Sequence, residues 1–228
     1  ASRLFSERGH EIAAVVAEPV QGAGGVHPPA PGYLAGLRKL CDQHGALLIL
    51  DEVICGWGRL GHWFGAQHYG VTPDLITFAK GVTSGYVPLG GVIVARTVSD
   101  VLESDPEFLL RHGYTYSGHP TSCAAGLATL AVYEQDGLFE RAGAIGALLG
   151  GRLSALVEDG LLAGHRGDGA VWAAELHPDR DPYVVRDAML ARGVIARPLV
   201  NAIAFCPPLV MTDDEVGCMI DALDAALR

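Results

Sequence analysis

The feature that most constrains this chain is residues 46–81, ALLILDEVICGWGRLGHWFGAQHYGVTPDLITFAKG. It contains two short apolar runs, residues 47–50 and 75–79, and a charged residue follows each of them, Asp51 and Lys80. Such runs, bounded by turn residues, are typical of strands buried on both faces in a parallel sheet under helices. Because ligands bind beyond the carboxyl ends of these strands, we expect Asp51 and Lys80 to lie at a ligand-binding edge.

A lysine and a carboxylate buried together suggest one kind of chemistry. Burying both charges is costly unless a function uses them. A pyridoxal phosphate site does so, because the lysine amine forms a Schiff base with the cofactor aldehyde and the carboxylate pairs with the protonated ring nitrogen. Asp-Glu after a strand and an isolated Ala-Lys-Gly are each also common without any such role, so this hypothesis depends on the rest of the chain.

Composition limits the class of protein. The chain has 228 residues, half of them apolar, and 30 glycines, which is typical of a tightly packed α/β protein. The net charge of −10 argues against a nucleic-acid or anionic-membrane partner. No apolar run approaches the roughly 18 residues of a membrane span. The five scattered cysteines form no CxxC pair, which favours a reducing compartment, the cytoplasm, without zinc or disulfides. The histidines lack metal-ligand spacing, so we expect no metal.

The first part of the chain reads as a parallel crossover unit. Residues 12–17 form an apolar strand candidate that Pro19 ends, and a glycine-rich loop follows at residues 20–26. Residues 33–44 have helical spacing, with Gly45 suited to cap the helix at its C-terminus. The strand to Asp51 then completes a β-loop-α-β unit. The start has no signal-peptide pattern and no Met, as if the chain began within a domain.

The loop after Asp51 carries a GxGxxG pattern at residues 56–61. We do not interpret it as a nucleotide site, because no long helix follows for a pyrophosphate to cap. Its aromatic residues are expected to line the wall of a pocket; the alternative is that they only pack the loop onto the domain. They are Trp57, Trp63, Phe64 and Tyr69.

The second half of the chain changes in character near residue 136. Before it we expect a strand at 89–94, a short helix at 97–102 and a helix from Pro120 to about residue 134, after a polar loop that is either an anion site or an ordinary N-cap. After it we expect helices at 139–156, 181–191 and 212–227 and strands at 167–176, 194–196 and 202–205. This α+β pattern predicts a second domain. Arg197, at a strand end, is either a carboxylate clamp or a surface arginine.

Five segments together resemble the class III pyridoxal-phosphate-dependent aminotransferases. They are AEPVQGAGGV, LILDEVICGWGRLG, ITFAKGVTSGYVPLGGVIV, YTYSGHPTSCAA and ARPLVNAIAFCPPLVMT. Within that class, the second and third segments are most similar to the ω-amino acid or amine:pyruvate branch. The resemblance implies an α/β, fold-type I (aspartate aminotransferase-like) transferase. It places an incomplete cofactor-binding large domain at residues 1–136 and an α+β small domain at residues 137–228.

The resemblance also implies residue roles around the cofactor. Lys80 resembles the lysine that forms the Schiff base and moves the substrate proton. Asp51 is similar to the partner of the ring nitrogen, Val53 to the residue packed on one ring face, and Gln21 to the glutamine that bonds the ring hydroxyl. Thr115, with Tyr114 beside it, resembles the threonine that reaches the phosphate of a neighbouring subunit's cofactor.

Three further residues are expected near the substrate. Arg197 resembles a mobile arginine that binds the substrate carboxylate, Glu18 the carboxylate near it, and Trp57 a side chain of the pocket. The expected activity is transfer of an amino group from an amine or ω-amino acid to a keto acid such as pyruvate, in a homodimer. Family members carry about as many residues again before this point. Alternatives left open are a catalytically silent fragment or partner subunit, and an aminomutase or decarboxylase on the same scaffold.

Overall fold

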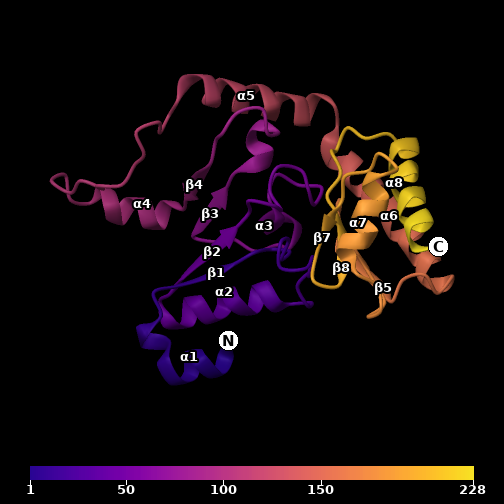
Figure 1. Cartoon of the computed structure of the whole chain (residues 1–228). Helices are drawn as coiled ribbons and strands as arrows, with labels where there is room; N and C mark the ends of the chain where they lie inside the picture. Colours follow the sequence, from indigo (N-terminus) through magenta and orange to yellow (C-terminus); the bar gives the residue numbers. More distant parts are fainter. The chain divides into compact units, whose positions relative to one another are not determined.

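A computed structural model describes all 228 residues of the chain. The chain forms two compact units (Figure 1). The first unit comprises residues 1–19, 29–57 and 64–135, and the second comprises residues 20–28, 58–63 and 136–228. The predicted boundary near residue 136 matches the start of the last segment of the second unit, but it does not account for residues 20–28 and 58–63, which also belong to that unit. The assignment of large and small domains stays a prediction.

The first unit is built on a four-stranded sheet in the order β1-β2-β3-β4. β1, β2 and β3 are parallel, and β4 pairs antiparallel with β3. Its elements are α1 (Ser2–Arg8), η1 (Gly9–Glu11), β1 (Ala14–Ala17), α2 (Tyr33–His44), β2 (Leu47–Asp51), α3 (Gly65–His68), β3 (Leu75–Phe78), η2 (Lys80–Thr83), β4 (Gly91–Val94), α4 (Arg96–Glu103) and α5 (Pro120–Gln135).

The β1-α2-β2 crossover forms as its sequence pattern predicts. α2 buries Leu34, Leu37 and Cys41, which recur at helical spacing, and it ends at Gly45. Gly45 has a φ of +68°, a left-handed conformation that glycine adopts without steric cost, and its N–H bonds to the carbonyl of Cys41. The predicted helix and its C-cap are therefore confirmed.

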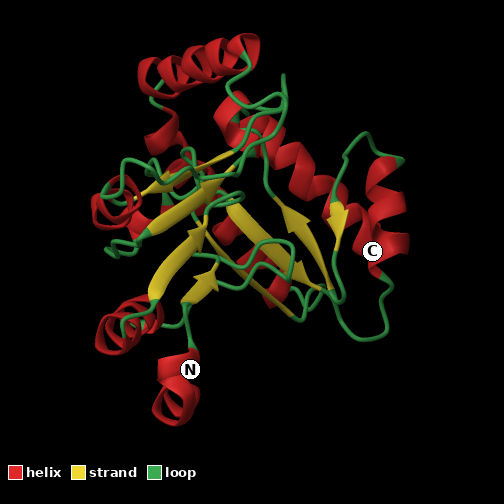
Figure 2. Ribbon diagram, turned by 90° about the vertical axis from the view of Figure 1, so that its left-hand side faces the viewer, coloured by secondary structure: helices red, strands yellow, loops and turns green.

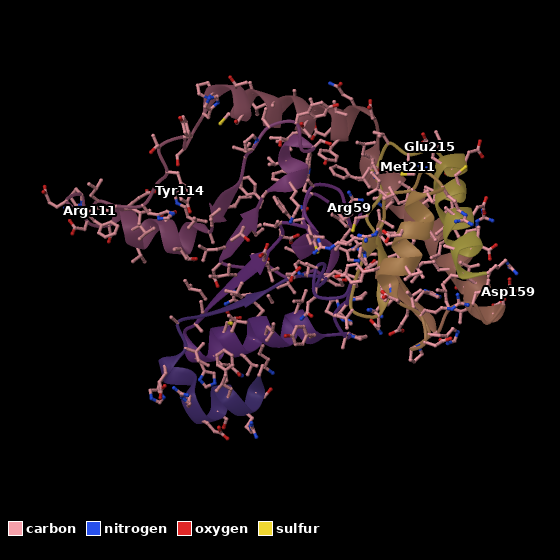
Figure 3. All side chains as sticks on the ribbon, in the orientation of Figure 1. Arg59, Arg111, Tyr114, Asp159, Met211 and Glu215 are labelled. Carbon is pink, nitrogen blue, oxygen red and sulfur yellow. The ribbon has the colours of Figure 1, made fainter.

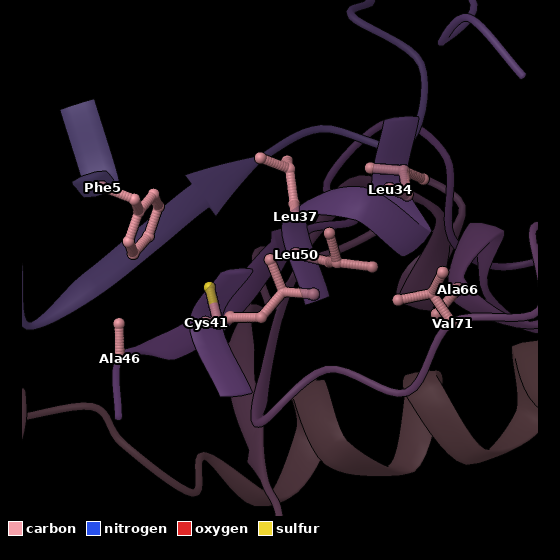
Figure 4. Packing of buried hydrophobic residues seen from close by; sticks show 9 residues of the cluster. Phe5, Leu34, Leu37, Cys41, Ala46, Leu50, Ala66 and Val71 are labelled. Atoms are coloured by element: carbon pink, nitrogen blue, oxygen red, sulfur yellow. The ribbon is translucent and has the colours of Figure 1, made fainter. Parts of the chain in front are cut away.

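Only one face of this sheet is packed within the chain. Leu48 and Leu50 of β2 are fully buried in a cluster with α2, and Figure 4 shows Leu50 there with Leu34, Leu37 and Cys41 of the helix. Val15 of β1 and Ile76 of β3 pack against this cluster. The strand register places Val16, Ile49, Leu75 and Val94 in one row on the opposite face. Val16 is 66% exposed there. The residues of β2 on this face and all of β3 are only half-buried, so the prediction that these strands are buried on both faces is wrong for this chain.

The second unit contains an antiparallel sheet in the order β5-β6-β8-β7. Its helices and strands are drawn in separate colours in Figure 2. They are α6 (Leu138–Glu158), β5 (Gly164–Asp168), β6 (Val171–Glu175), α7 (Pro182–Leu190), β7 (Arg197–Pro198), β8 (Ala202–Phe205) and α8 (Asp213–Leu227). α8 begins with the predicted capping box. The side chain of Thr212 accepts a hydrogen bond from the N–H of Glu215, and the side chain of Glu215 accepts one from the N–H of Thr212.

Two predicted strands of this unit differ from the structure. Residues 167–176 are not one strand, because the chain turns at Gly169, with a φ of +49°, and forms the β5–β6 hairpin. A Cβ on Gly169 would lie 2.6 Å from the carbonyl oxygen of Arg59, so only glycine fits this turn. Residues 194–196 form no strand, because the N–H of Val194 still bonds to Met189 in α7; β7 starts at Arg197.

Loop 58–63 is fastened to the rest of the second unit by Arg59 (labelled in Figure 3). Its guanidinium donates to the carbonyl oxygens of Ala170 and Pro207, at 3.3 and 2.5 Å. The Trp63 ring packs edge-on against Phe139 at 4.7 Å. Trp63 thus takes the packing role that we weighed against a place in a pocket wall. In neither unit is any helix both long and apolar enough to cross a membrane.

Candidate functional site

In the first unit, three charged residues lie at the carboxyl ends of three neighbouring parallel strands. Glu18 follows β1, Asp51 ends β2, and Lys80 comes two residues after β3. Asp51 pairs in register with Thr77 of β3, so the ends of β2 and β3 meet at the same sheet edge. This is the edge at which parallel sheets bind ligands. We call Asp51 and Lys80, with the strand ends that carry them, the carboxyl edge.

The carboxylate of Asp51 is held in place by its own backbone turn. Its Oδ1 accepts a hydrogen bond of 3.0 Å from the N–H of Val53, two residues on. Asp51 and Val53 are both half-buried. The second carboxylate oxygen has no protein donor, so it can accept a hydrogen bond from a ligand.

Lys80 is exposed, which corrects the expectation of a buried lysine. The lysine lies beyond the end of β3, in the turn η2, so the core of the sheet does not bury it. Its backbone φ is +45°, in the left-handed region that a side chain with a Cβ rarely adopts. The lysine opens the 3-10 turn η2 directly after Ala79. Strained residues of this kind persist only where the surroundings hold them, and they gather at functional sites.

Two aromatic side chains hold the turn that begins at Lys80. A Cβ on Gly81 would lie 2.9 Å from the Cβ of Trp57, so the turn packs directly on that tryptophan. The hydroxyl of Tyr133 in α5 donates to the carbonyl oxygen of Gly81 at 3.1 Å. Trp57 is only 8% exposed and packs edge-on against Phe64 and Phe78. The structure thus gives Trp57 a packing role; its contact with substrate stays a prediction.

Glu52 is a structural residue that our sequence analysis did not single out. It is fully buried, and its carboxylate accepts hydrogen bonds of 2.8 and 2.7 Å from the N–H groups of Gly65 and Ala66. Burial raises the pKa of Glu52, and the two hydrogen bonds oppose this shift without cancelling it. Glu52 therefore joins the start of α3 to the end of β2. The only sequence feature that pointed to Glu52 was its position directly after Asp51. For Tyr133, the sequence showed only a tyrosine within an apolar helix.

Tyr114, labelled in Figure 3, and Thr115 lie in the loop between α4 and α5, and both are exposed. The backbone N–H of Tyr114 donates a hydrogen bond of 2.9 Å to the hydroxyl of Ser117 within the same loop. Exposure is what a residue that reaches a neighbouring subunit requires. The role of this pair at a phosphate stays a prediction.

The second unit carries Gln21 and Arg197 on the walls of one cavity or next to them. The cavity has a volume of about 370 Å³ and is open between loop 20–28 and the β7–β8 turn. The loop is closed by two hydrogen bonds between the backbones of Gln21 and His27. The lining residues are Ala23, Gly24, Gly25, His27, Arg166, Tyr183, Arg197, Pro198, Leu199, Val200 and Asn201. Arg197 is exposed, which suits a side chain that binds a soluble anion.

The donor set at the carboxyl edge fits pyridoxal phosphate. A carboxylate with a free oxygen suits a protonated ring nitrogen, and an exposed lysine amine without an ion pair suits an aldehyde. Both come from adjacent strand ends. No group of three or more His, Cys, Asp or Glu side chains in the chain could hold a metal ion.

The sequence matches the family model of the class-III aminotransferases over residues 1–227. It is 41% identical to a diaminobutyrate–2-oxoglutarate transaminase of Halomonas elongata over 99% of the chain and 51% of that protein. It is 40% identical to an omega-aminotransferase of Caulobacter vibrioides, over 95% and 51%. The PLP-bound (internal aldimine) crystal structure of an amine transaminase from an uncultivated Pseudomonas species superposes with a TM-score of 0.94 at 42% identity, covering 99% of this chain and 54% of that one.

The chain therefore belongs to the class-III aminotransferase family. This confirms the predicted fold-type I class and the predicted cofactor of the family, pyridoxal phosphate. The resemblance to the ω-aminotransferase branch is confirmed as well. The chain spans about half the length of the relatives it matches. Each of these relatives is an aminotransferase, so none of them favours an aminomutase or a silent partner subunit.

Proposed function

We propose that this chain is the C-terminal part of a pyridoxal-phosphate-dependent transaminase that moves an amino group from an amine or ω-amino acid to a keto acid such as pyruvate. The observation that carries the proposal is the carboxyl edge, where Asp51 and Lys80 come from the ends of adjacent parallel strands. Family membership supports the reaction class. The relatives do not single out pyruvate as the keto acid, since one of them is named for 2-oxoglutarate.

Pyridoxal phosphate supplies a ring that takes up the electrons left when the substrate loses a proton. In this proposal the Lys80 amine would hold the cofactor through its aldehyde, and the same amine would serve as the general base and general acid for the substrate proton. Asp51 keeps a proton on the ring nitrogen, and its hydrogen bond from Val53 keeps the carboxylate oriented for this. Val53 would pack on one face of the ring.

The remaining residues bind rather than react. Gln21 donates to or accepts from the ring hydroxyl, and Thr115 with Tyr114 binds the cofactor phosphate of a second subunit in a homodimer. Arg197 binds the carboxylate of acidic substrates, with Glu18 as the neighbouring carboxylate. Arginine suits that task because its planar fork can form two parallel hydrogen bonds with a carboxylate.

The outer face of the first unit's sheet supports the need for a further polypeptide. The row from Val16 to Val94 is apolar, and Val92 in β4 is 52% exposed. Sheets with parallel strands are normally covered on both faces, and edge strands are normally protected by charges or proline. β4 (GVIV) has neither. We infer that residues equivalent to the half of the relatives that this chain does not match cover this face.

Covalent labelling tests the proposed role of Lys80. The purified chain is incubated with pyridoxal phosphate, reduced with borohydride and mapped by peptide mass spectrometry. The sequence contains two lysines, Lys80 and the exposed Lys39, so Lys39 serves as an internal control. We expect a stable adduct at Lys80 that the Lys80→Ala variant lacks and the Lys39→Ala variant keeps. Equal labelling of both lysines, alone and with the complementary half present, would refute the assignment.

Turnover tests the reaction itself. The chain together with the N-terminal half of a relative, supplied with an amine donor and pyruvate, is expected to form alanine. Asp51→Asn should keep the Lys80 adduct and slow proton removal, which a deuterated donor would reveal. Formation of a decarboxylated or rearranged product in place of alanine would overturn the transaminase proposal.

A further inference from the structure

Two arginines line the cavity of the second unit, and they differ in their partners. Arg166, in β5, donates from Nε to the carbonyl oxygen of Gly25 at 2.9 Å, and its Nη1 pairs with Glu175 Oε1 at 3.1 Å. Its side chain is only 18% exposed. Arg197, in β7, is exposed and forms no ion pair. The cavity therefore presents one neutralised and one unpaired guanidinium.

Glu175 is held by one residue from each side of the cavity, Arg166 and Asn201. The register sets Arg166 opposite Ala173 and Glu175 opposite Gly164, so the ion pair is a diagonal pair across β5 and β6. The same Oε1 accepts a hydrogen bond of 3.1 Å from the amide of Asn201, in the β7–β8 turn. A Cβ on Gly164 would lie 2.9 Å from Glu175 Oε2, so the glycine leaves room for the carboxylate.

We propose that Glu175 is a specificity-determining positioning residue: by pairing with Arg166 it leaves Arg197 as the only unpaired guanidinium of the cavity, so that the cavity favours ligands with one carboxylate over ligands with two. The idea rests on the proposed function in taking this cavity as the place where a substrate carboxylate binds. Glu175 does not touch the ligand. It acts by occupying Arg166, which otherwise adds a second positive charge to the cavity wall.

The test compares two probes, butyrate with one carboxylate and glutarate with two, titrated into the 228-residue chain by calorimetry or NMR. Wild type should bind butyrate at least as well as glutarate. Glu175→Gln should raise the affinity for glutarate relative to butyrate about fivefold, the size expected for one partly screened charge pair. Glu158→Gln, which changes the net charge equally at the exposed end of α6, should leave the ratio unchanged.

A double variant traces the effect to Arg166. Arg166→Gln combined with Glu175→Gln should return the ratio to the wild-type value. A gain that persists in the double variant, or an equal gain in Glu158→Gln, overturns the proposal, as does a lack of saturable binding of both probes to wild type.

If Glu175→Gln does not fold, Gly164→Ala serves in its place, because the added Cβ displaces the Glu175 carboxylate. A glutarate-to-butyrate ratio that stays at the wild-type value in Gly164→Ala also overturns the proposal. Because both probes are read by binding alone, a failed Lys80 adduct leaves this test valid.

Discussion

The hydroxyl of Tyr133 donates a hydrogen bond of 3.1 Å to the carbonyl oxygen of Gly81, the residue that follows Lys80. Tyr133 lies in α5 and is buried, whereas Gly81 lies in the turn η2. The bond therefore joins a helix, distant in sequence, to the backbone of the candidate catalytic lysine. It also helps to hold Lys80 at a φ of +45°, a conformation that the isolated residue would leave.

Tyr133→Phe should weaken both stability and the geometry of Lys80. It removes a hydrogen bond to a carbonyl in a turn, at a cost of about 1 kcal/mol in the free energy of unfolding. We expect a lower urea midpoint and slower formation of the Lys80 adduct with pyridoxal phosphate. Tyr33→Phe is the control, since Tyr33 is exposed at the start of α2. An equal effect of both variants on the adduct rate would contradict this role for Tyr133.

Gly81→Ala should displace the turn that carries Lys80. The added Cβ would lie 2.9 Å from the Cβ of Trp57, which is itself wedged between Phe64 and Phe78. Overpacking of this kind typically costs about 1–3 kcal/mol. Thermal unfolding should therefore shift to lower temperature.

The control for Gly81→Ala is a glycine with open space around it. Gly36 lies within α2, and a Cβ there would meet nothing within 4 Å. Gly36→Ala should raise the free energy of unfolding by about 0.5–1 kcal/mol, because alanine favours the helix. If Gly81→Ala were neutral while Gly36→Ala stabilises, the contact with Trp57 would not limit the turn.

Local patterns were sufficient to predict the elements that place the site. The apolar stripe of α2, Gly45 as its C-cap and the capping box at Thr212 depend on neighbours in sequence, so their spacing specified them. The strand ends at Asp51 and near Lys80 followed from short apolar runs for the same reason. The strand predicted at residues 167–176 failed because the local sequence does not reveal a turn held by a tertiary contact, here Gly169 against Arg59.

Contacts between segments distant in sequence could not be predicted. The strained φ of Lys80, the support from Tyr133 and the buried carboxylate of Glu52 each depend on which segments meet in the fold. The ion pair of Arg166 with Glu175 depends on the register of β5 and β6, which single-strand patterns do not fix.

Lys80→Gly and Lys80→Ala should separate the chemistry of Lys80 from its backbone strain. Both remove the amine, so neither should form the adduct with pyridoxal phosphate. Glycine adopts a φ of +45° freely, whereas alanine pays roughly 1 kcal/mol for it. We therefore expect Lys80→Gly to unfold at a higher urea concentration than Lys80→Ala. Equal midpoints would mean that the conformation of Lys80 carries no strain.

Asp74 should give the protein an acid-dependent part of its stability. It joins α2 to the sheet, because its Oδ2 accepts hydrogen bonds of 2.7 Å from both the guanidinium of Arg38 and the N–H of Leu48. Partial burial alone would raise the pKa of Asp74, but these hydrogen bonds and the charge of Arg38 outweigh it and hold the pKa below its usual value. Asp74 therefore contributes stability that is fully present above the ordinary aspartate pKa of about 3.9 and is lost as the pH falls through the lowered folded-state pKa.

Asp74→Asn should remove this contribution. We expect it to lower the free energy of unfolding at pH 7 by about 1–3 kcal/mol and to flatten the fall in stability below pH 4, as measured by urea unfolding across pH. Asp42→Asn is the matched control, because Asp42 pairs with the same Arg38 at 2.7 Å but is largely exposed. Its loss should change stability by less than about 1 kcal/mol and leave the acid slope in place. If both variants flattened the slope equally, the acid dependence would come from the charge of Arg38 in general and not from the buried link that Asp74 forms between α2 and the sheet.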